Sequence, residues 1–346
     1  MTYSMNDPSI DAQIDQLVAD VVASTDGLTT NADLVLEIII SALKVVKDRS
    51  NRGDVRMMNT ALKELRYSSL VFQPFAQTKK VAVYGSARTD PEDPNYLMAE
   101  EFGRRLADDH DYLVITGAGP GIMEAANKGA GTENSFGVNI RLPFENGANE
   151  YLAPGKVINF KYFFTRKVQF VKESDAFSLF PGGYGTLDEA FELLTLIQTG
   201  KSDLHPIVMV EAEGTGYWSA WETLCDALLD QGMITPSDLN LYMVTSDLDE
   251  AVSEILRFYR VYHSQRFVDG QAVLRLKTEV SEELLAELSE EFSDIIRSGM
   301  IESIPATQAE VDTDDHLDLP RIAFDFDRHG YGRLRALIDR LNDSVE

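Results

Sequence analysis

The first stretch of the chain carries apolar residues at every third or fourth position. This period predicts amphipathic helices, and three are expected: one with Ile10, Ile14, Leu17, Val18, Val21 and Val22, one with Leu34, Ile38, Ala42 and Val45, and one with Val55, Met58, Leu62 and Leu65. Each helix has an apolar side that needs a surface to cover. Residues 1–78 are therefore expected to be a helical extension that docks on the next domain or on a second subunit.

From Lys80 onward, short apolar runs alternate with helical patterns. The runs predict strands at Val81–Arg88, Tyr112–Thr116, Ser135–Leu142, Lys156–Phe160, Ala176–Phe180, Pro206–Val210 and Leu241–Thr245. Alternating strands and helices are typical of an α/β fold with a parallel sheet between two layers of helices. We predict a Rossmann-like, doubly wound catalytic domain over residues 79–261.

The last stretch has a different pattern. Ala272, Leu274 and Leu276 alternate with polar neighbours, as in a half-buried strand, and helical periods follow at Leu284–Ile295 and Leu334–Leu341. A second alternating run covers Ile322–Asp327. Residues 262–346 are expected to form a small α+β domain.

Composition narrows the classes of partner. The chain has 346 residues and a formal net charge of −26, from 57 acidic and 31 basic residues. Nucleic acids and anionic membranes require a basic surface, so neither is expected as a partner. Cys225 is the only cysteine, which excludes an intrachain disulfide and a thiolate metal cluster. The N-terminus has no signal-peptide pattern and no apolar run long enough to span a bilayer, so we expect a cytoplasmic protein.

Three glycine-rich turns follow predicted strands: one at Gly85, one at Gly117–Gly121 and one at Gly182–Gly185. Right-handed crossovers place the C-terminal ends of parallel strands at one edge of the sheet, where open α/β sheets bind ligands. Taken alone, Gly117-x-Gly119-x-Gly121 is not the full dinucleotide fingerprint and fits a tight-packing turn equally well. The convergence of three such turns favours a ligand site.

The segment Pro181–Glu189, PGGYGTLDE, is the most informative motif. A strand that passes through several glycines into a helix exposes backbone N–H groups at the helix N-terminus, which suits a phosphate. The alternative is a plain tight turn. Glu189 has two interpretations, because Thr186-x-x-Glu189 also fits a helix capping box. The helix dipole is expected to keep Glu189 ionised, as a stabiliser of positive charge rather than a proton donor.

A cationic partner for Glu189 is expected from geometry. The helix predicted at Phe163–Glu173 runs ~15 Å in one direction along the sheet. The strand from Ala176 to Pro181 runs ~17 Å back in the opposite direction. Arg166 and Lys167 should therefore return to the level of the glycine loop, although an ordinary solvated pair is the alternative. The acidic run Asp312–Asp318 lacks the glycine and the terminal glutamate of an EF-hand, so a solvated loop is favoured over a metal site.

Arg166-Lys167, Asp175-Ala176-Phe177 and PGGYGTLDE together resemble the Lonely Guy family, formerly called lysine decarboxylases. The resemblance covers roughly Lys79–Arg260, with 23 residues between Arg166 and Glu189 as in the family. It also includes the GAGPGIM turn at Gly117–Met123, and Asn59–Phe72 looks like the longer bacterial members. It implies a phosphoribohydrolase, which splits a nucleoside 5′-monophosphate such as AMP or a cytokinin nucleotide into a free base and ribose 5-phosphate.

The resemblance implies Arg166 and Glu189 as catalytic residues. The substrate-binding residues expected from the motifs and the resemblance are Gly85, Ser86, Gly117, Gly119, Gly121, Met123, Lys167, Pro181, Gly182, Gly183, Gly185 and Thr186. No metal and no organic cofactor is required, and a homo-oligomer of two or more subunits is expected. Short members usually carry a tryptophan before the helix glutamine and a histidine–lysine pair before the next strand. Here Leu196-Ile197-Gln198 and Leu204-His205-Pro206 stand in those places, so the resemblance does not identify the preferred base.

Two other classes of function compete with this hypothesis. One is a non-catalytic nucleotide or cofactor sensor of the same fold. The other is a pyridoxal phosphate decarboxylase, which needs a Schiff-base lysine and an acid for the ring nitrogen. Lys167 is the only lysine near the loop and no such acid can be placed. The presence of both Arg166 and Glu189 favours the hydrolase.

Overall fold

The structure is a computed structural model that describes residues 3–24, 31–141 and 147–345. The chain divides into two compact units, Met1–Arg66 and Tyr67–Glu346.

The first unit is helical, as its sequence period predicts. It contains α1 (Pro8–Ala23), α2 (Ala32–Lys47) and the start of α3 (Arg52–Phe72). The carboxylate of Asp7 caps α1 by accepting hydrogen bonds from the backbone N–H groups of Ser9 and Ile10. α1 and α2 pack against each other around a small core of buried side chains: Met5, Ile14, Val18 and Ile40.

The second unit is built on a parallel sheet. Among the described residues this sheet has seven strands in the order β4-β3-β2-β1-β5-β6-β7. Every adjacent pair is parallel. The strands are β1 (Lys80–Tyr84), β2 (Leu113–Thr116), β3 (Ser135–Ile140), β4 (Val157–Phe160), β5 (Ala176–Leu179), β6 (Ile207–Val210) and β7 (Met243–Thr245). All seven lie within the runs that the sequence predicts, apart from one added residue at the start of β1.

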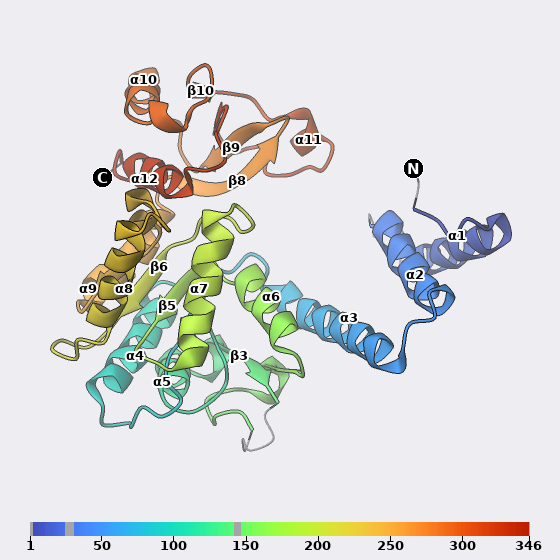
Figure 1. Ribbon diagram of the computed structural model, residues 1–346, viewed down its shortest axis with the longest axis horizontal. Helices are drawn as coiled ribbons and strands as arrows, with labels where there is room; N and C mark the ends of the chain where they lie inside the picture. The colour runs from blue at the N-terminus through green and yellow to red at the C-terminus, as the bar shows by residue number, and fades with distance from the viewer. Residues whose placement is uncertain (1–2, 25–30, 142–146, 346) are drawn as a thin grey trace. The chain divides into compact units, whose positions relative to one another are not determined.

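Helices cover both faces of this sheet (Figure 1). Successive strand residues point to opposite faces, so Val81 and Val83 join one core cluster and Ala82 and Tyr84 the other. The first cluster includes side chains of α4 (Pro94–Arg104), α5 (Ile122–Ala130) and α9 (Leu248–Phe258). The second includes side chains of α6 (Phe163–Glu173), α7 (Tyr184–Gln198) and α8 (Trp218–Asp230). The predicted doubly wound α/β fold is confirmed.

The sheet order positions the glycine turns. β1 lies between β2 and β5 and pairs with both in parallel. The chain continues from β1 toward one side of the sheet and returns to β5 on the other, which makes the β1–β5 boundary a topological switch point. Such a point is where open α/β sheets bind ligands. The turns at Gly85, Gly117 and Gly182 are thereby neighbours on one edge, as expected.

The C-terminal region adds a second sheet. It is antiparallel, with the order β10-β11-β9-β8, and it is accompanied by three helices. The elements are β8 (Tyr262–Val268), β9 (Gln271–Leu276), α10 (Glu282–Glu291), β10 (Glu302–Ser303), α11 (Gln308–Val311), β11 (Arg321–Phe324) and α12 (Tyr331–Asn342). Figure 1 shows these strands and α12 together at one end of the unit.

This α+β region shares a core with the parallel sheet. Leu274, Phe324 and Leu337 are buried in the same cluster as Phe177 and Leu193. Residues 67–346 accordingly form one compact unit. The boundary placed at 261–262 stays a prediction, and the sequence missed strand β8.

The acidic loop before β11 is held by arginines. Arg275 donates to the carboxylate of Glu310 at 2.8 Å and also bonds Asp315, which in addition pairs with Arg266 at 3.1 Å. Among the described residues, no group of three or more His, Cys, Asp and Glu side chains is arranged to hold a metal ion. The described helices include none whose length and apolar character would let it cross a bilayer.

Candidate active site

A cleft of about 660 Å³ opens at the edge of the sheet where β1, β2 and β5 end. Its walls come from the three glycine turns and from the first turns of α6 and α7. Eleven of the fourteen residues predicted for the site line this cleft, namely Gly85, Ser86, Gly117, Gly119, Met123, Arg166, Gly182, Gly183, Gly185, Thr186 and Glu189.

Hydrogen bonds to backbone carbonyls hold the glycine turns together. The N–H of Ser86 donates to the carbonyl of Pro181 at 3.0 Å, and the N–H of Ile122 donates to the carbonyl of Ser86 at 3.0 Å. The hydroxyl of Tyr217 donates to the carbonyl of Gly182 at 2.7 Å. The floor of the cleft is therefore fixed by two main-chain hydrogen bonds and by the side chain of Tyr217.

The glycines of these turns serve two different purposes. A Cβ on Gly117 would lie 2.5 Å from a terminal nitrogen of Arg166, and one on Gly119 would lie 2.7 Å from the methyl carbon of Met123. These two glycines make room for side chains. At Gly183 and Gly185, a Cβ would meet no atom of the described residues within 4 Å, although both line the cleft. Glycine at these two positions leaves the backbone open to a ligand.

Helix α7 presents its N-terminus to the cleft. Gly183 is its N-cap residue, and the first backbone bond of the helix runs from the N–H of Leu187 to the carbonyl of Gly183. The N–H groups of Tyr184, Gly185 and Thr186 precede that bond and are the donors that a helix start offers to an anion. Thr186 lies inside the first turn, so the capping-box interpretation of Thr186 and Glu189 is wrong.

Arg166 and Glu189 meet on the wall of the cleft. A terminal nitrogen of Arg166 lies 3.8 Å from the carboxylate of Glu189, and the two side chains are 11% and 9% exposed. The Nε of Arg166 donates to the carbonyl of Val138 at 2.9 Å, and its guanidinium lies over the ring of Phe170, 5.1 Å from the centroid. The guanidinium is thus oriented from several sides, with one edge toward Glu189.

The protonation of Glu189 differs from the sequence-based expectation. Burial raises the pKa of Glu189 to about 7, although Arg166 and Lys167 act to lower it. The 3.8 Å separation from Arg166 is long for an ion pair, so the attraction does not offset the loss of hydration. The expectation that the helix dipole keeps the carboxylate ionised is corrected.

Three predicted residues lie outside the cleft lining. Lys167 forms ion pairs with Asp188 at 2.8 Å and Glu192 at 3.1 Å, which fasten α6 to α7. Gly121 has a φ of +69°, and a Cβ there would lie 2.3 Å from the carbonyl oxygen of Ser86, so its role is to shape the turn. Pro181 supplies the carbonyl that accepts from Ser86.

Sequence reasoning missed several side chains that line the cleft. Phe163 and Tyr184 stand at its rim, 52% and 94% exposed. Tyr84 ends β1 beneath the cleft; its ring packs on Phe170, and its buried hydroxyl has no hydrogen-bond partner among the described residues. The only sequence signal was position, since Tyr84 directly precedes a glycine turn and Phe163 opens the helix of Arg166.

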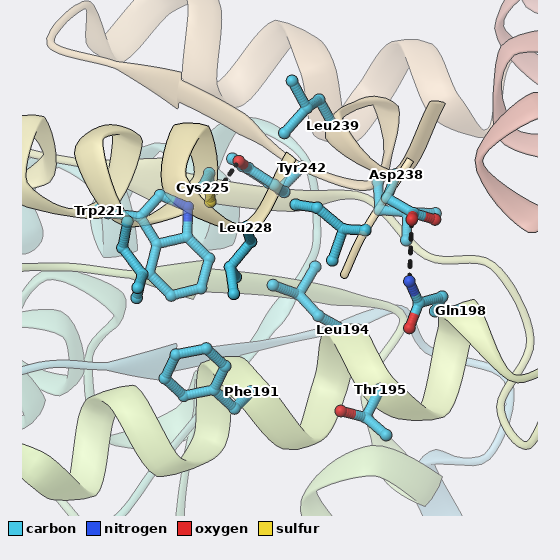
Figure 2. A pocket seen from close by; sticks show the side chains of 13 residues that line it. Phe191, Leu194, Thr195, Gln198, Trp221, Cys225, Leu228, Asp238, Leu239 and Tyr242 are labelled. Carbon is cyan, nitrogen blue, oxygen red and sulfur yellow. Dashed lines mark hydrogen bonds between the residues drawn. The ribbon is translucent and has the colours of Figure 1, made fainter. Parts of the chain in front are cut away.

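A second, smaller cavity of about 110 Å³ lies between α7, α8 and the short helix at Pro236–Leu241. Figure 2 shows Phe191, Leu194, Trp221 and Leu228 around it. Its polar groups are largely paired with each other: Gln198 donates to Asp238 at 2.9 Å, and Tyr242 donates to the sulfur of Cys225 at 3.3 Å. It contains none of the predicted site residues. The glycine-lined cleft is the candidate active site.

Comparisons with known proteins show what the chain is similar to. The family model described as "Possible lysine decarboxylase" matches residues 123–255, which include Arg166 and the PGGYGTLDE segment. The predicted resemblance of the central region to the Lonely Guy family is confirmed by this match. Its resemblance to the longer bacterial members stays a prediction.

Two curated plant proteins are similar to part of the chain. The probable cytokinin riboside 5′-monophosphate phosphoribohydrolase LOG4 of Oryza sativa subsp. japonica is 25% identical over 181 residues, covering 51% of this chain and 76% of the relative. The cytokinin riboside 5′-monophosphate phosphoribohydrolase LOG1 of Arabidopsis thaliana is 33% identical over 90 residues, covering 26% of this chain. That second match spans 41% of the relative, less than half of its length.

A solved structure is also similar to the chain. It is the molybdenum cofactor binding protein from Rippkaea orientalis, with 18% sequence identity and a TM-score of 0.38. The likeness covers 52% of this chain and 96% of that protein.

Proposed function

We propose that the chain is a nucleoside 5′-monophosphate phosphoribohydrolase. Water adds to C1′ of the ribose, the bond from C1′ to the base nitrogen breaks, and the base leaves with a proton, giving free base and ribose 5-phosphate. The observation that carries the proposal is the juxtaposition of Arg166 and Glu189, 3.8 Å apart, beside the open backbone of Gly183 and Gly185.

The start of α7 is the proposed phosphate site. The N–H groups of Tyr184, Gly185 and Thr186 and the dipole of a 15-residue helix favour a dianion there. Glu189 follows on the same helix, so a phosphate at the helix start fixes the distance from the ribose to the carboxylate. Holding the sugar in this way lowers the entropic part of the barrier.

Glu189 is the proposed catalytic carboxylate. Cleavage of a glycosidic bond passes through an oxocarbenium-like state, which a carboxylate stabilises. A pKa of about 7 also suits a general base that accepts a proton from the attacking water. Arg166 positions the carboxylate and assists departure of the base. Phe163 and Tyr184 at the rim supply aromatic surface for stacking on the base.

Incubation of the purified protein with AMP tests the proposal. We expect equimolar free adenine and ribose 5-phosphate, resolved by chromatography, and release about 10³-fold slower by the Glu189→Gln variant. Tight AMP binding without turnover would favour a nucleotide-binding protein instead. A parallel panel of purine, pyrimidine and cytokinin monophosphates identifies the preferred base.

A further inference from the structure

The first helical unit exposes an unusual amount of apolar surface. Of the 28 large hydrophobic side chains that are exposed among the described residues, 13 belong to residues 3–66, about a fifth of the chain. Single exposed apolar side chains are ordinary, but contiguous ones on a small unit mark a surface that is covered by a partner.

These side chains form stripes on helices. On α3, Val55, Met58 and Leu62 are 40%, 46% and 48% exposed and recur at spacings of three and four. This is the spacing of a helix that packs lengthwise on another helix. On α2, Leu34 and Ile38 are 56% and 47% exposed, on the side away from the core residue Ile40.

Charge is divided sharply along this unit. Residues 1–43 contain seven acidic residues and no lysine or arginine; the acids are Asp7, Asp11, Asp15, Asp20, Asp26, Asp33 and Glu37. Residues 44–66 contain seven basic and three acidic residues; the bases are Lys44, Lys47, Arg49, Arg52, Arg56, Lys63 and Arg66. Four of these bases, Arg52, Arg56, Lys63 and Arg66, lie on α3 with the acids Asp54 and Glu64, so α3 is net basic in a chain whose net charge is −26.

We propose that the N-terminal helices form an interface with the N-terminal helices of a second copy of this chain. The acidic side of α1–α2 in one copy packs on the basic, apolar-striped α3 of the other. A twofold axis repeats the same contact in the opposite direction, so both apolar stripes and both charge patches are covered at once. Complementary charge fixes the register, and apolar burial supplies the affinity.

A second copy is favoured over an unrelated partner by this complementarity. The unit carries two complementary surfaces, one acidic and apolar and the other basic and apolar. A foreign acidic helix would cover α3 and leave the apolar side chains of α2 in water. Reciprocal pairing of two copies covers both.

The first test compares the molar mass of the full chain with that of the double variant Met58→Glu/Leu62→Glu by sedimentation velocity. We expect the variant to have half the molar mass at the same concentration. Met233→Glu/Met300→Glu is the matched control, because these methionines are 67% and 58% exposed in the second unit. The control should keep the full mass. An unchanged mass for Met58→Glu/Leu62→Glu would overturn the proposal. An unchanged mass together with lower thermal stability would indicate that the apolar stripe of α3 packs within its own chain.

The second test exchanges the charges. Arg52→Glu/Arg56→Glu makes α3 acidic, and Asp33→Lys/Glu37→Lys makes α2 basic. Each variant alone should weaken self-association at least tenfold, because like charges then face each other. An equimolar mixture should restore the parental mass through mixed pairs, which a tag on one variant detects. A mixture that stays at the halved mass would contradict the charge pairing. Both tests are independent of catalytic activity.

Discussion

Two of the cavities that helix α7 lines differ in chemistry. Its first turns face the glycine-lined cleft, where Glu189 lies near Arg166. Its later turns face the small apolar cavity, where Phe191 and Leu194 meet Trp221 (Figure 2). The first cavity combines open backbone with a buried carboxylate whose pKa is raised. The second is lined mainly by apolar side chains, and its polar groups are largely paired. Substitutions in the first should change catalysis, and substitutions in the second should change stability.

The largest expected effect follows from Glu189→Gln. Loss of the carboxylate should lower kcat by about 10³-fold, while the free energy of unfolding at pH 7 does not fall, because the burial of an ionised group is removed. Steady-state rates of adenine release and urea unfolding measure both quantities. Glu192→Gln is the control, since Glu192 lies on the same helix and pairs with Lys167. Equal losses of rate in the two variants would show that the loss is not specific to the carboxylate in the glycine-lined cleft.

Trp221→Ala should lower stability and leave catalysis almost unchanged. Trp221 is 6% exposed and packs against Phe191 at 5.2 Å and Tyr242 at 5.9 Å between ring centroids. Its truncation should destabilise the fold by about 3–5 kcal/mol, as for large core aromatics, with kcat/KM for folded protein within about twofold. Leu224→Ala, on the same helix but 41% exposed, should cost clearly less. A large fall in kcat/KM for Trp221→Ala would connect the apolar cavity to catalysis.

The pH dependence of activity and of stability tests the role of the buried carboxylate in the glycine-lined cleft. With a pKa raised to about 7, Glu189 is protonated in the folded chain below that pH. If the ionised form acts, kcat/KM should fall about tenfold per pH unit below 7. Stability should change in the other direction: the raised pKa favours folding below pH 4.5, and this contribution is lost as the pH rises through 7. An activity limb that titrates at pH 4–5 instead would contradict a buried catalytic carboxylate.

Gly185→Ala should give the smallest effect. Gly185 lies in the first turn of α7, and a Cβ there meets no described atom within 4 Å. Alanine should therefore stabilise the helix by about 0.5–1 kcal/mol while raising KM for the nucleotide, because the methyl group occupies the proposed approach to the backbone. Thermal unfolding and KM are the measurements. An unchanged KM would place the phosphate elsewhere.

The sequence predicted the scaffold of the site better than its electrostatics. Strand and helix lengths placed Arg166 at the level of the glycine loop, because rise per residue is a fixed property of each element. The same argument placed Lys167 there, but neighbouring helical residues point about 100° apart. Lys167 therefore faces Asp188 and Glu192.

The protonation of Glu189 could not be predicted from local sequence. Its pKa depends on side chains that the fold packs around it and on the distance to Arg166. Strand β8 was missed for a related reason: Tyr262–Val268 is largely polar, and its pairing with β9 makes it a strand. Long-range contacts decide both features.

The backbone construction of the cleft floor has a consequence for divergence. The N–H of Ser86 donates to the carbonyl of Pro181, and the carbonyl of Gly182 accepts from Tyr217, so this floor does not depend on the rim side chains Phe163 and Tyr184. Tyr184, 94% exposed, can be replaced without dismantling the turn beneath it. Under the proposed function, base preference is therefore expected to change with a few rim residues while Arg166 and Glu189 are kept.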